Sequence, residues 1–109
     1  DYMCSIMNRV IKDMQVNEKA MAENIRRSYN VFFSQQLLLK LVNKGILRED
    51  AYRIVQRNAH AAFDERVMFD EKIKSDSRIT DVLSDKDLES VFNFDKYTNH
   101  VDMIFNRVF

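Results

Sequence analysis

"VFFSQQLLLKLVNKGILREDAYRIVQRNAHAAF", residues 31–63, contains two helix-like patterns on either side of Gly45, the only glycine of the chain. When residues 31–44 are placed at 100° per residue, apolar side chains cover most of the circumference. The narrow strip that remains holds Gln36, Lys40, Asn43 and Lys44. We therefore expect this first helix to be buried on several sides. Gly45 lies where helix C-termini favour glycine, and the lysines lie near the negative end of the helix dipole.

The second pattern, from Arg48 to about Arg66, predicts an amphipathic helix. Its apolar half contains Ala51, Tyr52, Ile54, Val55, Ala59, Ala62 and Phe63. Its polar half contains Glu49, Arg53, Arg57, His60 and Asp64, so we expect His60 to be solvated rather than catalytic. Asn58 falls inside the apolar half and Gln56 at its border, and a buried amide is unfavourable unless it is hydrogen-bonded. A tie from Asn58 to a neighbouring helix end is favoured over direct contact with a ligand.

The remaining sequence adds further helices. Residues 1–14 have helical spacing, and Asn17 can cap a second helix that ends near Asn30, a residue that tolerates left-handed backbone. A short amphipathic segment follows at Phe69–Asp76, then a capping-box-like "SDKD" at 84–87, and then one apolar stripe through Tyr97–Val108. With no proline and one glycine, an all-β fold is excluded in practice. We predict an all-α fold, a small bundle of about six to seven helices.

Composition limits the classes of function. The chain has 109 residues, enough for one domain, and its 17 basic and 17 acidic side chains cancel without forming blocks. Nucleic-acid binding is therefore disfavoured, and no apolar run approaches the roughly 20 residues that span a bilayer. The single cysteine, Cys4, has no intramolecular partner and no signal peptide precedes it, which favours a cytoplasmic location. Because the chain opens at Asp1 inside an apolar pattern, we expect it to be a piece of a longer protein.

Local motifs for catalysis are missing. His60 and His100 are far apart in the sequence and have no Cys or His at ligand spacing, so no metal site is expected. One glycine cannot build the usual phosphate-binding loops, and no nucleophile elbow is available to present Ser34. Arg26 and Arg27 fit a solvated helix face better than an anion site. No cofactor is predicted.

Four stretches of sequence carry a specific resemblance: "FSQQLLLKLVNKGILREDAYRIVQRNA" at 33–59, "ITDVLSDKDLESVFNFDKYTNHVDMIFNRVF" at 79–109, "VNEKAMAEN" at 16–24 and "DYM" at 1–3. Together they resemble the carboxy-terminal domain of the adenylosuccinate lyase family, within the fumarase/aspartase superfamily. The resemblance implies that residues 1–14 are the tail of a long middle-domain helix and that 15–109 form the helical C-terminal domain. One departure is Leu47, where the family commonly has a Ser or Thr helix cap.

The resemblance also implies a function. The family eliminates fumarate from adenylosuccinate, giving AMP, and from succinyl-aminoimidazole-carboxamide ribotide in purine biosynthesis. It works without a cofactor, as a homotetramer, and its acid, base and substrate-gripping residues lie in the preceding domains. No catalytic, substrate-binding or metal residue is therefore assigned here, and this piece alone is expected to be inactive. The expected partners are the preceding domains, the other tetramer subunits and a purine ribotide substrate, with no nucleic acid and no membrane.

Several alternatives remain open at this point. Within the superfamily, another lyase or a carboxymuconate cycloisomerase carries a related terminal domain. From a different class, a stand-alone helical interaction module could use the apolar helix at 31–44 to bind a partner helix. It is also open whether Gln35, Gln56 or Asn58 approaches the active-site region of a larger enzyme. The stripe of Tyr2, Ile6 and Val10 leads us to expect self-association of the isolated chain.

Overall fold

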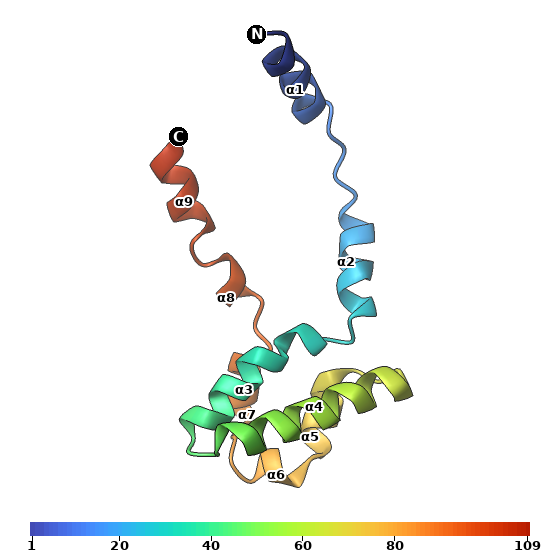
Figure 1. Cartoon of the computed structure of the whole chain (residues 1–109), viewed down its shortest axis with the longest axis vertical. Coiled ribbons are helices and arrows are strands. Elements are labelled where there is room, and N and C mark those ends of the chain that lie inside the picture. Colours follow the sequence, from blue (N-terminus) through green and yellow to red (C-terminus); the bar gives the residue numbers. More distant parts are fainter.

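The computed structural model describes residues 1–109, and all of its regular structure is helical (Figure 1). The elements are α1 (Tyr2–Lys12), α2 (Glu18–Arg27), a 3₁₀ turn η1 (Val31–Phe33), α3 (Ser34–Asn43), α4 (Arg48–Glu65), α5 (Phe69–Ser75), α6 (Ser77–Thr80), α7 (Asp85–Val91), α8 (Asp95–Thr98) and α9 (Val101–Val108). The all-α prediction is confirmed. There are more helices than the six or seven expected, because α6 was not foreseen and the last expected helix is broken.

The break lies at Asn99 and His100, between α8 and α9. Thr98, Asn99 and His100 are three successive residues of low helix propensity, and the Thr98 hydroxyl bonds back to the carbonyl of Asp95 at 3.3 Å. The apolar residues predicted to form one stripe on a single helix are therefore divided between two short helices. The first helix is also slightly shorter than the roughly 13 residues expected, with 11 residues.

A single core forms where α3 packs against α4, which is the most extensive contact between helices, and α5, α6 and α7 close around this pair. The buried apolar side chains are Phe33, Leu37, Leu41, Ala51, Val55, Ala59, Ala62, Phe69, Ile73, Ile79, Leu83, Leu88 and Val91. Their spacing follows the helical period on each helix, so each helix presents one continuous stripe to the core.

The buried face of α3 covers a smaller part of the helix circumference than its sequence predicts. Leu37 and Leu41 are fully buried, whereas Leu39 is 46% exposed and Phe32 is also exposed. On α4, Tyr52 and Phe63 were placed in the apolar half, yet each is about half exposed. The reason is that these side chains lie at the edges of the apolar arcs, beyond the reach of the helices that cover the core. Phe63 still makes an edge-on contact with Tyr29, at 5.6 Å between ring centroids.

Helix ends follow the local signals in the sequence. The Asn17 side chain caps α2 by accepting from the amide of Ala20 at 3.0 Å, and Asn30 has a left-handed φ of 62°. Gly45 has φ of 97°, and no atom lies within 4 Å of the position a Cβ would take, so glycine is required by backbone conformation rather than by space. Ser84 and Asp87 form the predicted capping box. Leu47 precedes α4 without a side-chain cap.

Two arms extend from the compact part on the same side, α1–α2 at the N-terminus and α8–α9 at the C-terminus (Figure 1). The radius of gyration is 18.9 Å, compared with about 13 Å for a compact domain of this length. The apolar side chains of α1 and α9 are exposed, and neither helix takes part in the more extensive pairings. Both arms therefore present apolar surface that this chain does not cover.

The C-terminal arm is anchored to the core by aromatic rings. Phe94 lies 5.2 Å from Phe33 and 5.3 Å from Phe32, and Tyr97 lies 6.0 Å from Phe33, all between ring centroids. Phe33 is buried, whereas the other three rings are partly exposed. This aromatic cluster continues the core outward between the bases of the two arms.

Candidate functional site

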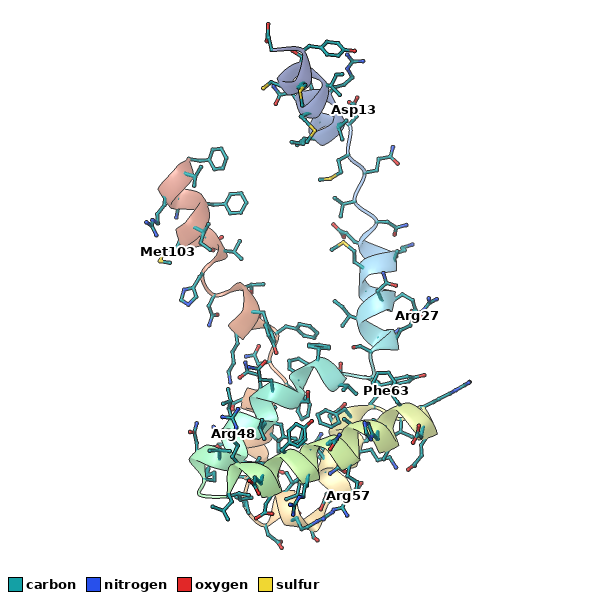
Figure 2. All side chains as sticks on the ribbon, in the orientation of Figure 1. Asp13, Arg27, Arg48, Arg57, Phe63 and Met103 are labelled. Carbon is teal, nitrogen blue, oxygen red and sulfur yellow. The ribbon has the colours of Figure 1, made fainter.

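The polar candidates from the sequence lie on the exposed side of α4. Arg53, Arg57 and His60 are all exposed, as predicted. Arg53 makes only a long ion pair with Asp50, at 3.7 Å. His100 lies at the start of α9 on the C-terminal arm and is also exposed. In Figure 2, Met103 on that arm is remote from Arg57 on α4. The structure therefore does not bring the two histidine-bearing segments together.

Asn58 is buried, with 8% of its surface exposed, and its amide is satisfied. Its Nδ2 donates to the Ile54 carbonyl at 2.9 Å and to Oδ2 of Asp76 at 2.8 Å. Asp76 is the residue that caps α6, because its Oδ1 accepts from the amide of Arg78 at 3.1 Å. The predicted tie from Asn58 to a neighbouring helix end is confirmed, and Asn58 is a structural residue in this chain.

Sequence reasoning missed the partner of Asn58. The Arg78 guanidinium bonds both carboxylate oxygens of Asp76, with Nε to Oδ1 at 3.0 Å and Nη2 to Oδ2 at 2.9 Å. The Asp76 carboxylate thus accepts hydrogen bonds from the side-chain amide of Asn58, from the backbone N–H of Arg78 and from the Arg78 guanidinium. The signal that could have revealed it is the sequence Asp-Ser-Arg at 76–78, because an Asp before a short helical turn is a strong N-cap.

A partly buried charge cluster joins α3 to α7. The Nζ atoms of Lys40 and Lys44 lie 3.0 Å from Oδ1 and Oδ2 of Asp87, respectively, and only 16% of the Asp87 side chain is exposed. Hydrogen bonds from Lys40, then Lys44, and to a smaller extent from Ser84 hold the pKa of Asp87 well below its usual value, against the opposing effect of desolvation. Because this carboxylate stays ionised and is saturated with donors, it serves packing rather than proton transfer.

A groove of mixed polarity, with a volume of about 360 Å³, lies between α3 and α4. Its polar lining consists of Ser34 and Gln35 on α3 and Tyr52, Gln56 and His60 on α4. Leu38, Val55 and Ala59 form its apolar floor. We call this feature the α3–α4 groove. The sequence left open whether Gln35, Gln56 or Asn58 approaches an active-site region. Gln35 and Gln56 line this groove, whereas Asn58 lies on the other side of α4.

No three side chains from His, Cys, Asp and Glu converge as a potential metal site. None of the helices combines the length and the apolar character required to cross a bilayer.

Comparison with known proteins gives a consistent result. Residues 30–108 match the family model described as the adenylosuccinate lyase C-terminus. The adenylosuccinate lyase of Thermotoga maritima is 39% identical over 106 residues, covering 97% of this chain and 25% of that protein. The adenylosuccinate lyase of Streptococcus mutans is 34% identical over 108 residues, covering 99% of this chain and 25% of that protein. The chain therefore spans about a quarter of the length of these relatives, and it belongs to the adenylosuccinate lyase family, whose C-terminal domain it matches.

Proposed function

We propose that this chain is the C-terminal domain of a lyase that eliminates fumarate from adenylosuccinate, giving AMP, and from succinyl-aminoimidazole-carboxamide ribotide in purine biosynthesis. The observation that carries the proposal is the alignment of 97–99% of this chain with a quarter of two proteins named adenylosuccinate lyase. The reaction breaks a carbon–nitrogen bond and removes a proton from the carbon beside a carboxylate, so it requires a base and an acid placed around the substrate.

In this proposal, the acid, the base and the substrate-binding residues lie outside the chain, and no residue of the chain is assigned to catalysis. The side chains provide support for this view. His60 and His100 are exposed and remote from each other, and Asp87 is saturated by two lysines. The domain would instead stabilise the geometry around an active site built by the rest of the enzyme.

The domain organisation is part of the same proposal. Residues 1–14 form the tail of a middle-domain helix, and residues 15–109 form the C-terminal domain. The irregular link at 14–17 and the exposed apolar face of α1 support a boundary there. The exposed arms are consistent with packing against the preceding domains and against other subunits of a homotetramer. The proposed enzyme is cytoplasmic and uses no cofactor.

The test is to express the full-length protein that contains this chain and to follow the loss of adenylosuccinate spectrophotometrically. We expect turnover with release of fumarate and AMP, and no turnover by the 109-residue chain at the same molar concentration. Circular dichroism of the short chain serves as the control that it is folded. Turnover of a carboxymuconate, with none of adenylosuccinate, would instead assign the protein to the cycloisomerases of the superfamily.

A further inference from the structure

The α3–α4 groove differs from the rest of the surface in its charge. Asp, Glu, Lys and Arg make up 31% of the chain, yet none of the residues that line the groove is of these types. Depletion of fully charged side chains, together with an exposed tyrosine such as Tyr52, is typical of the centre of a protein interface. A solvated face would instead carry the charge density found elsewhere on α4.

The polar groups of the groove have no partners within the chain. Ser34, Gln35, Tyr52, Gln56 and His60 make no side-chain hydrogen bond to another residue, in contrast to Asn58, whose Nδ2 donates two. Two of them are amides on opposite walls, Gln35 on α3 and Gln56 on α4. Each amide offers both donors and an acceptor, which is the combination that the N–H and C=O groups of an extended main chain require.

The lining also argues against a charged small molecule. The substrate in the proposed function carries a phosphate and carboxylates, and such anions are bound by Arg, Lys or clustered backbone N–H groups. The groove has no Arg or Lys, and His60 is the only basic side chain in its lining. Binding of an uncharged peptide segment satisfies the amides and covers the apolar floor of Leu38, Val55 and Ala59 without burying a charge.

We propose that the α3–α4 groove is a docking site for an extended, uncharged segment of the same polypeptide, from the part that precedes the C-terminal domain. The relatives are about four times as long as the region they share with this chain, which leaves about three quarters of their sequence to supply the segment. The inference rests on family membership and on the groove, and it does not depend on which reaction the enzyme catalyses.

The experiment measures cysteine labelling in the full-length protein and in this chain. Gln35→Cys and Gln56→Cys are made separately in a Cys4→Ser background, because Cys4 is exposed and free. Arg57→Cys is the control, since Arg57 is exposed on the α4 side that faces α5 and α6. Labelling with a maleimide is quantified at each site by peptide mass spectrometry, and the melting curve of each variant is recorded.

In the 109-residue chain, we expect the three cysteines to react at similar rates. In the full-length protein, Gln35→Cys and Gln56→Cys should react about tenfold or more slowly, because labelling then requires the covering segment to open, while Arg57→Cys stays fast. Equal rates at all three sites in the full-length protein would overturn the proposal. Protection that disappears on dilution would assign the groove to a second copy and overturn it too. Enzyme activity is not part of this readout, so the outcome is separable from that of the proposed reaction.

Discussion

Asn58 and Asp76 are joined by a 2.8 Å hydrogen bond that connects the middle of α4 to the capped start of α6. The bond explains why an amide occupies a position that the helical period assigns to the core. It also fixes the turn between α5 and α6, because the same carboxylate accepts from both the guanidinium and the backbone amide of Arg78, the second residue of α6. This buried amide thereby helps to position α6, whose Ile79 is also buried in the core.

Replacing Asn58 with alanine should lower the free energy of unfolding by about 1–3 kcal/mol, because Asp76 then loses a partly buried donor. The measurement is urea denaturation followed by circular dichroism. Gln56→Ala, on the same helix and exposed, is the control and should change stability by about 0.5 kcal/mol or less. A loss equal to that of the control would show that the Asn58 bond contributes nothing to stability.

Asp87→Asn should destabilise the fold at neutral pH and should also flatten its acid dependence. The folded state lowers the pKa of Asp87, so the stabilisation is fully present above the unfolded-state pKa of about 4 and is lost as pH falls below that value. The difference between wild type and variant should therefore shrink in acid. Asp85→Asn is the control, because Asp85 shares the first turn of α7 but has no lysine partner. Denaturation at a series of pH values checks the prediction.

Leu37 and Leu39 provide a matched pair on α3, since Leu37 is fully buried and Leu39 is 46% exposed. Leu37→Ala should cost about 2–5 kcal/mol through lost burial and the cavity left behind. Leu39→Ala should change the stability of the isolated chain by about 0.5 kcal/mol or less. Similar costs for the two variants in urea denaturation would mean that the side of α3 that carries Leu39 is buried as well, as expected from a sequence that predicts burial on several sides.

Leu47 offers a route to greater stability. It occupies the N-cap position of α4 with φ of −56° and ψ of 137°, and its side chain is 73% exposed and makes no cap. Leu47→Ser should raise the free energy of unfolding by about 1 kcal/mol by accepting a bond from an unpaired amide of the first turn. Leu47→Ala removes the same apolar surface without adding a cap, so it should give no comparable gain in thermal or urea denaturation.

The arms lead to a prediction about association. Tyr2, Ile6 and Val10 are exposed along α1, and apolar stripes of this kind drive self-association when nothing covers them. Sedimentation of the isolated chain should show a concentration-dependent increase in mass, and Ile6→Lys combined with Val10→Lys should reduce it. A stable monomer with a well-ordered α1 at high concentration would contradict this expectation.

The sequence by itself determined the all-α class, the positions of most helix ends and the family. The family follows from a resemblance of whole runs of sequence. The helical class and the helix ends depend on local physics, because hydrophobic period, N-caps such as Asn17 and Ser84, and the left-handed preference of Gly45 and Asn30 act within a few residues. The same local reasoning placed His60 in solvent and required a partner for Asn58. It could not choose that partner, since Asp76 lies 18 residues away and is brought near only by the packing of α5 against α4.

Only the tertiary structure decided which of the apolar side chains on each helix are buried by neighbouring helices. Leu37 and Leu39 have the same side chain, yet they differ in burial because α4 and α7 contact one side of α3 and nothing in the chain reaches the other. Tertiary packing likewise made Asp87 the shared partner of Lys40 and Lys44, and it brought the amides of Gln35 and Gln56 to opposite walls of one groove. Burial and long-range pairing depend on the positions of several helices at once, and the period of one helix does not contain that information.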